Sequence, residues 1–331
     1  MNAAPEGELH PWLLPAWERL QAHVEGGRLP QALLIHGPSG LGKAALAERF
    51  AHRLLCTGAG TRPCGRCAGC HLLAAGTHPD YRRIAPEEPG KPIRVDAIRR
   101  LIGDLALKAQ YEGYRVSLIE RAEQMNVSSA NALLKTLEEP AEHNLIILVA
   151  EAPSRLPPTI LSRCQKIAIT PPTAAEAAHW LSLRQPGIAA DTLLNAAGGS
   201  PLRALALADS DVVERRRRVF EEFRAIADQR QDPVAVAERW HALSHEECLD
   251  WMLCWLPDLI RLAVGASPLR VRNADVLPEL QRLAAGLGPR GLLNYWRELL
   301  ALRQALGTQA NRQLLLEETL IRWSRLGSRH G

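Results

Sequence analysis

The sequence predicts an α/β domain with a mainly parallel sheet, followed by a region that is helical throughout. Apolar strand-like runs alternate with amphipathic helical segments up to about residue 170, a pattern typical of parallel sheets. After Pro171-Pro172 only helical spacing of apolar residues recurs. A chain of 331 residues accommodates two or three domains. We expect them over 1–170, 171–208 and 209–331.

The first domain begins with a helical pattern over residues 9–29, in which Trp12, Leu13, Trp17 and Leu20 recur on one side. The continuous apolar run 32–36 predicts a buried parallel strand, and a glycine-rich loop follows it. The next helix is expected over 42–55, and another over 93–108 after a cysteine-rich segment.

Two further buried strands are expected over 116–119 and 144–149. Between them, apolar residues at helical spacing predict a helix over 126–139 that Pro140 ends. The rest of the chain is expected to form a small bundle up to about residue 208 and a larger bundle after it.

The glycine-rich loop reads Gly37-Pro38-Ser39-Gly40-Leu41-Gly42-Lys43-Ala44 and matches a phosphate-binding loop except at its last position. Its glycines let backbone N–H groups surround phosphates at a helix N-terminus, and its lysine reaches the outer phosphates. The Ser or Thr that normally coordinates Mg²⁺ is Ala44 here. Gly37, Gly40, Gly42 and Lys43 therefore predict a degenerate nucleotide site, weak or vestigial, in which Mg-ATP is not expected.

The second strand leads to the same expectation. Motor ATPases end this strand with an Asp for Mg²⁺ and often a Glu that activates water. Here the chain reads Ile119-Glu120-Arg121. Glu120 reaches a metal only from an altered position, and Arg121 is no base because its guanidinium stays protonated. We expect no independent ATP hydrolysis by this chain.

Four of the seven cysteines lie close together in the sequence, at Cys56, Cys64, Cys67 and Cys70. Thiolates separated by two residues, one of which is glycine, wrap a cation, and four complete a tetrahedron. This closed set predicts a structural zinc module at 56–70. An iron–sulfur cluster and four reduced thiols without metal are the alternatives. An iron–sulfur cluster would need a further cysteine after three intervening residues, where Ala74 stands. The other cysteines, Cys164, Cys248 and Cys254, are expected to be buried packing residues.

Arg163, in Ser162-Arg163-Cys164, follows a short helical segment just past the last predicted strand. An arginine supplied in trans to a neighbour's γ-phosphate accelerates hydrolysis by about 10³–10⁵. From residue chemistry alone, pairing with a surface carboxylate is the more common role of such an arginine.

Composition excludes some functions. The net charge is +4, too small to argue for nucleic-acid binding by itself. No apolar run reaches the roughly 20 residues that cross a bilayer, and residues 1–8 do not resemble a secretory signal. The chain is expected in the cytoplasm.

The run Arg215–Arg218 has acidic neighbours, which predicts a solvated helix face. Five C-terminal tryptophans at helical spacing predict core or subunit packing: Trp240, Trp251, Trp255, Trp296 and Trp323.

The tracts Asn131-Ala132-Leu133-Leu134-Lys135-Thr136-Leu137-Glu138-Glu139-Pro140 and Ile160-Leu161-Ser162-Arg163-Cys164 resemble those of the AAA+ subunits of the bacterial replicative clamp loader. The cysteine module and Gly76-Thr77-His78-Pro79-Asp80 belong to the same pattern. The resemblance covers residues 10–205 closely, and the C-terminal third only as a helical region of suitable length.

Two kinds of subunit share these motifs. The gamma/tau motor has an intact phosphate loop and an Asp-Glu pair, whereas delta-prime subunits have a degraded site and keep the Ser-Arg-Cys motif. Ala44, Glu120 and Arg121 make this chain similar to the delta-prime kind. The tract Val149-Ala150-Glu151-Ala152 also departs from the motor pattern, and Arg203 matches a second sensor arginine that is expected to be structural here.

The resemblance implies an AAA+ domain with an inserted zinc module, a small helical lid and a C-terminal helical collar. It implies a non-hydrolysing, rigid end subunit (stator) of a five-subunit clamp loader, with Arg163 acting in trans on the adjacent motor. The implied partners are gamma/tau and delta, and, through the complex, the sliding clamp and primed DNA, with no membrane. The chain would then be one subunit of the DNA-directed DNA polymerase III holoenzyme, a nucleotidyltransferase only as a complex.

Two alternatives stay open from the sequence. The first is a weakly active, gamma/tau-like ATPase motor in which Glu120 and water replace the missing metal ligands. The second is a zinc-dependent DNA-binding module that uses the arginine run, against which the small net charge and the acidic flanks argue.

Overall fold

The structure, a computed structural model, describes residues 9–60, 62–88, 91–111, 113–139, 141–187, 189–208, 211–241, 243–268, 271–305 and 312–327. Residues 1–8, for which no secretory signal is expected, and Pro140, expected to end a helix, lie outside them. Contacts within the chain divide it into two compact units, Met1–Pro172 and Thr173–Gly331. Among the described helices, none has both the length and the apolar character needed to cross a membrane.

A parallel sheet forms the centre of the first unit. In the described residues it has five strands in the order β2-β3-β4-β1-β5. They are β1 (Ala32–His36), β2 (Tyr81–Ile84), β3 (Arg115–Ile119), β4 (Asn144–Ala150) and β5 (Gln165–Ala168). The register pairs Leu34 of β1 with Leu148 of β4, and Ser117 of β3 with Ile146 of β4. The predicted α/β class with a parallel sheet is confirmed.

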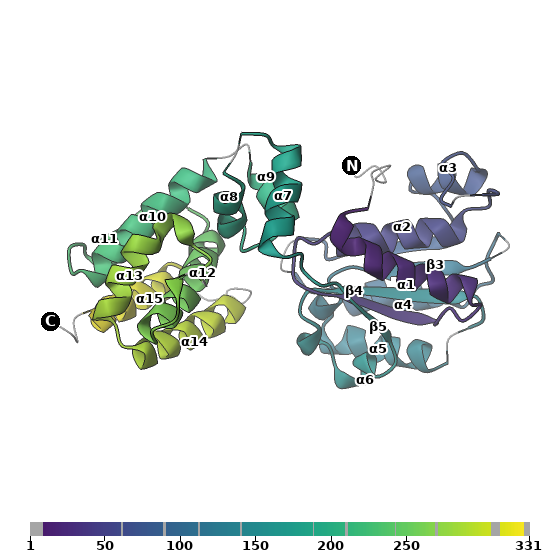
Figure 1. Ribbon diagram of the computed structural model, residues 1–331. Coiled ribbons are helices and arrows are strands. Elements are labelled where there is room, and N and C mark those ends of the chain that lie inside the picture. The colour runs from purple at the N-terminus through teal and green to yellow at the C-terminus, as the bar shows by residue number, and fades with distance from the viewer. Residues whose placement is uncertain are drawn as a thin grey trace. The chain divides into compact units, whose positions relative to one another are not determined.

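Helices cover both faces of this sheet (Figure 1). On one face lie α1 (Leu14–Glu25), preceded by the 3₁₀ turn η1 (Pro11–Leu13), and α2 (Lys43–Leu55). On the other lie α4 (Val95–Leu105), α5 (Val127–Glu138) and α6 (Pro158–Leu161). The short helix α3 (Ala68–Ala74) follows α2, and the 3₁₀ turns η2 (Ala122–Gln124) and η3 (Pro153–Arg155) follow β3 and β4.

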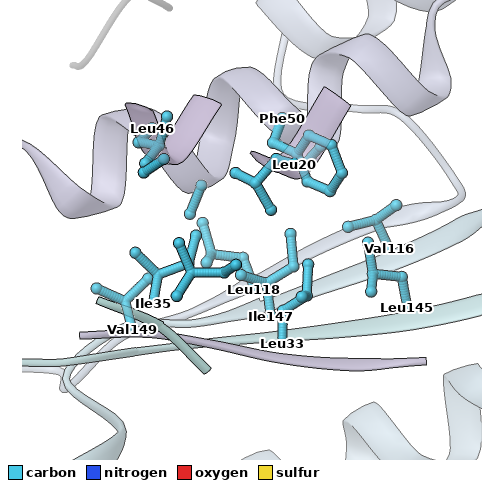
Figure 2. Packing of buried hydrophobic residues seen from close by; sticks show 14 of the residues in the cluster. Leu20, Leu33, Ile35, Leu46, Phe50, Val116, Leu118, Leu145, Ile147 and Val149 are labelled. Carbon is cyan, nitrogen blue, oxygen red and sulfur yellow. The ribbon is translucent and has the colours of Figure 1, made fainter. Parts of the chain in front are cut away.

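Because side chains alternate along a strand, the central strands supply both cores. Figure 2 shows the core beneath α1 and α2, where Leu20 and Phe50 face the sheet side chains. The sheet residues in this core include Leu33, Ile35, Val116, Leu118, Leu145, Ile147 and Val149. The intervening residues Leu34, Ile146 and Leu148 belong to the core under α4 and α5. All seven residues of β4 are buried, which explains its continuous apolar sequence.

The edge strands β2 and β5 were not predicted from the sequence. Each has only four residues, and most of them are exposed or half-buried because a neighbouring strand pairs on one side only. Sequences such as Tyr-Arg-Arg-Ile and Gln-Lys-Ile-Ala have no continuous apolar run, so they lack the signal that revealed β1, β3 and β4.

The second unit is helical throughout its described residues (Figure 1). It contains α7 (Ala174–Arg184), α8 (Ala190–Ala196), α9 (Pro201–Leu207), α10 (Val212–Ala227), α11 (Pro233–Trp240), α12 (His245–Ala263), η5 (Ala274–Val276), α13 (Leu277–Gly286), α14 (Pro289–Ala305) and α15 (Arg312–Gly327). Thr173 begins α7 with a capping box, in which its hydroxyl accepts from the Glu176 N–H and Glu176 accepts from the Thr173 N–H. The predicted helical C-terminal region is confirmed.

Aromatic rings form the centre of this unit. Trp323 stacks on Phe223 with ring centroids 4.1 Å apart, and Tyr295 stacks on Trp323 at 5.3 Å. The Trp323 indole N–H donates to the Phe223 carbonyl at 2.7 Å. Trp240, Trp251, Trp255 and Trp323 are all buried, and Trp296 is half-buried. These tryptophans therefore act mainly as core residues, as their spacing predicted.

The solvated face expected for Arg215–Arg218 is wrong at Arg216, which is 1% exposed. Its guanidinium donates to Asp275 and to Asn273 Oδ1, each at 2.5 Å, and lies 5.5 Å from the ring centroid of Trp255. The carboxylate of Asp275 and the buried Asn273 offset the cost of desolvating this charge. Arg217 and Arg218 are exposed, so the prediction holds for part of the run.

Candidate functional site

The loop 37–42 lies between β1 and α2, at the carboxyl end of an interior strand of the sheet, where α/β sheets bind ligands. Gly42 caps α2 with φ +82°, a conformation that favours glycine. A Cβ at Gly37 would lie 2.6 Å from the Ile169 carbonyl oxygen, so this position also requires glycine. The strand–loop–helix arrangement that a phosphate-binding loop requires is therefore present.

The lysine of this loop is turned onto its own loop. Lys43 is 4% exposed, and its ammonium donates to the Pro38 carbonyl at 2.5 Å. Burial lowers the pKa of Lys43, while the carboxylates of Glu151 and Glu123 act in the opposite direction. Glu123 also accepts the Glu151 backbone N–H at 3.2 Å. The Lys43 ammonium thus has a backbone acceptor in its own loop, and the negative charges of Glu123 and Glu151 act on the same site, where they would repel a triphosphate.

Glu120, at the end of β3, is engaged elsewhere. Its carboxylate lies 2.6 Å from Arg83 Nε on the neighbouring strand β2, and Arg83 also lies 3.8 Å from Glu48 on α2. Arg121 follows with φ +48°, an uncommon conformation for a residue with a side chain. Glu120, which was expected to reach a metal only from an altered position, is therefore paired with Arg83.

The four clustered cysteines converge in space. Cys56 follows α2, Cys67 is the N-cap of α3, and Cys70 lies within α3. The sulfurs of Cys56, Cys64, Cys67 and Cys70 all lie within 4.8 Å of one another. Tetrahedral zinc with Zn–S bonds of about 2.3 Å separates its sulfurs by roughly 3.8 Å, and Cys56 and Cys67 Sγ are 3.9 Å apart.

Backbone geometry supports this cluster. The Cys64 N–H donates to Cys56 Sγ and the Cys70 N–H donates to Cys67 Sγ, both at 3.4 Å. Such N–H groups stabilise thiolate charge in metal sites. A Cβ at Gly58 would lie 2.5 Å from Cys64 Sγ, so only glycine fits against this sulfur. The donor set fits a structural metal ion with four thiolate ligands.

Arg163 lies just after α6 in the first unit, with about a third of its side chain exposed. Its Nη2 lies 2.5 Å from the Glu138 carboxylate, and its Nη1 donates to the Thr159 carbonyl at 2.8 Å. The structure therefore places an accessible guanidinium at the end of a short helix, with a carboxylate partner.

Comparison with known proteins decides the family. The model for "DNA polymerase III, delta subunit" matches residues 14–173, and that for its C-terminal part matches residues 210–325. The chain is 40% identical to the DNA polymerase III subunit delta' of Pseudomonas aeruginosa over 327 residues, covering 96% of this chain and 98% of the relative. It is 36% identical to the Escherichia coli delta' subunit over 322 residues, covering 95% and 94%.

The chain belongs to the delta-prime family of DNA polymerase III subunits. It is also 30% identical to the E. coli subunit tau over 324 residues, covering 89% of this chain and 50% of tau. The resemblance to clamp-loader subunits of the delta-prime kind is thus confirmed.

In this delta-prime chain the candidate second sensor arginine is bound within the helical unit. Arg203 lies 2.9 Å from Asp250 of α12, and Asp250 also lies 3.3 Å from Arg303 of α14. The structural role expected for Arg203 agrees with these contacts.

Sequence reasoning missed the partners of the site residues. It did not identify Arg83 as the partner of Glu120, Glu123 and Glu151 as neighbours of Lys43, or Glu138 as the partner of Arg163. These pairs are distant in sequence, and no local pattern marks them.

Proposed function

We propose that this chain is a non-hydrolysing stator of the clamp loader that supplies Arg163 in trans to the ATP site of an adjacent motor subunit. One contrast carries the proposal. The chain's own loop has Lys43 bonded to Pro38 and no hydroxyl at Ala44, whereas Arg163 is one-third exposed at the end of α6. A guanidinium adds positive charge where negative charge develops on a transferring phosphoryl group.

The residual nucleotide site consists of Gly37, Gly40, Gly42 and Lys43, and Mg-ATP is not expected there. The alternative, a weakly active motor of the gamma/tau kind, requires Glu120 to hold a metal ion. The Glu120 carboxylate instead forms an ion pair with Arg83, whose Nε lies 2.6 Å from Oε1, and this pairing argues against that alternative. The chain would thus contribute to the polymerase holoenzyme without an activity of its own.

We further propose that Cys56, Cys64, Cys67 and Cys70 hold one structural Zn²⁺ ion. Bound zinc cross-links the segment between α2 and α3, which contributes few buried apolar side chains of its own. Four thiolates leave no open coordination position, so the ion would not take part in a reaction.

For the domain organisation, we propose an AAA+ domain over 1–170, a lid over 171–208 and a collar over 209–331. Lid and collar residues are joined by polar contacts: the Trp251 indole N–H donates to the Ala196 carbonyl at 3.0 Å, and Asn195 Nδ2 donates to the Arg272 carbonyl at 3.0 Å. These contacts, with the Arg203–Asp250 pair, support a lid fixed on the collar, as a rigid stator requires. The proposed partners are gamma/tau and delta, and through them the clamp and primed DNA, in the cytoplasm.

The test is ATP hydrolysis by the reconstituted loader in the presence of clamp and primed DNA. Arg163→Ala should lower stimulated turnover strongly while the complex still assembles by gel filtration. Arg155→Ala, which removes an exposed arginine of η3, is the matched control and should leave turnover unchanged. Unchanged turnover in Arg163→Ala would reject the trans role.

A further inference from the structure

Glu138 is the only described residue that forms an ion pair with Arg163. It is the last residue of α5, and Arg163 follows the end of α6, 25 residues later. Glu138 Oε1 lies 2.5 Å from Arg163 Nη2, and the Thr159 carbonyl of α6 accepts from Nη1 at 2.8 Å. The guanidinium is therefore held at two nitrogens by groups from two different helices.

This contact contributes little to the stability of the fold. The side chains of Arg163 and Glu138 are 32% and 48% exposed, and exposed ion pairs in water add little because solvent screens them. Its main physical effect is on the arginine itself. A long side chain with many rotamers is restricted to one orientation when both ends of its planar guanidinium are bonded.

The frame behind the pair is rigid. Leu137, next to Glu138, and Ile160, in α6, are buried in the same apolar core beneath the sheet. Because both helix ends are fixed in one core, neither end can move away from the other without disrupting that core. The carboxylate thus holds Arg163 at a constant position relative to α5 and α6. This arrangement suits a contact that orients the guanidinium better than one that must break to release it.

We propose that Glu138 is a positioning residue for Arg163, orienting the guanidinium toward the neighbouring subunit's nucleotide. This inference rests on the proposed trans role of Arg163. Nη1 donates to the Thr159 carbonyl and, at 3.4 Å, to Ser162 Oγ, Nη2 donates to Glu138, and no described hydrogen bond involves Nε. Nε–H and the second N–H of Nη2 are left to donate to phosphate oxygens.

A double-mutant cycle in the reconstituted loader tests the proposal. The variants are Glu138→Gln, Arg163→Ala and the double variant, and the readouts are the single-turnover rate of ATP hydrolysis and ATP affinity. Glu139→Gln is the control, since it removes the same charge from the adjacent exposed position. Misplacement of a catalytic group by about 1 Å costs up to about 10²-fold. Glu138→Gln should therefore slow hydrolysis at the affected site about tenfold, with ATP affinity and assembly unchanged.

The decisive result is the effect of Glu138→Gln on hydrolysis in the chain with Arg163 compared with its effect in the Arg163→Ala chain. In the Arg163→Ala chain, Glu138→Gln should have no further effect, because there is no guanidinium left to orient. An effect that persists in this background, or a Glu138→Gln chain that hydrolyses at the normal or a higher rate, would overturn the positioning role while leaving the trans role of Arg163 intact. If Arg163→Ala itself has no effect, the proposed function fails, and the inference about Glu138 fails with it.

Discussion

His52 should make the first unit sensitive to mild acid. This side chain lies on α2, is 8% exposed, and has its ring 5.8 Å from that of Tyr81 in an edge-to-face arrangement. Burial, with a smaller contribution from His78, lowers the pKa of His52 from 6.5 to about 4. Between these values the unfolded chain binds the proton and the folded chain does not. Stability is therefore intact above pH 6.5 and is lost as the pH falls toward 4.

The magnitude follows from the two pKa values. At pH 5, an unfolded pKa of 6.5 and a folded pKa of about 4 give a loss of about 2 kcal/mol in the free energy of unfolding. At pH 7.5 the same shift costs almost nothing, because His52 is neutral in both states. A variant with an uncharged ring of similar size, His52→Phe, keeps the packing against Tyr81 and removes the titration.

The assay is urea unfolding of the wild-type chain and His52→Phe at pH 7.5 and pH 5. Acid also affects other histidines and the cysteine cluster, but it does so in both chains, so the difference between them isolates His52. The wild-type chain should lose about 2 kcal/mol more than His52→Phe between the two pH values. An equal acid loss in the two chains would refute the assignment of a low pKa to His52.

Three further predictions concern packing and the metal module. Trp323→Phe removes the indole N–H that bonds the Phe223 carbonyl, and should lower the free energy of unfolding in urea by about 1–3 kcal/mol; a change below 0.5 kcal/mol would contradict the importance of this bond. Asp80→Ala leaves Arg115 buried without its carboxylate and should lower the free energy of unfolding by about 3–5 kcal/mol in the same assay. The control Asp104→Ala removes the exposed ion-pair partner of Arg82 and should cost under about 1 kcal/mol. Cys67→Ser should reduce zinc content by elemental analysis and expose the segment between α2 and α3 to proteolysis; full zinc content would count against four-thiolate ligation.

The sequence predicted the central part of the sheet well because those strands are buried on both faces. Strands β1 and β4 contain continuous apolar runs, and β3 has an apolar run that only Ser117 interrupts. Strands β2 and β5 lie at the edges and expose most of their residues, so their sequences resemble loops. Edge strands form because a neighbour offers hydrogen bonds, which no local pattern reveals.

The site was predicted unevenly for a similar reason. The glycine loop and the cysteine spacing are local motifs, so their residues could be identified before the fold was known. The partners of Lys43, Glu120 and Arg163 are brought together only by folding. At Arg216 a local pattern was misleading. A run of arginines indicates solvent exposure, but Arg216 faces the core. The periodicity of α10 places Arg216 on the face that also contains Val212, Val219 and Phe223.

The central claim is that this chain completes a neighbour's nucleotide site and does not use its own. The most direct measurement is single-turnover ATP hydrolysis by loaders that contain Lys43→Met or Arg163→Ala, with clamp and primed DNA present. Lys43→Met alters the chain's own loop and should leave the amplitude of the fast phase unchanged, whereas Arg163→Ala should remove the contribution of one site. A fast phase that Lys43→Met reduces and Arg163→Ala leaves intact would contradict the account.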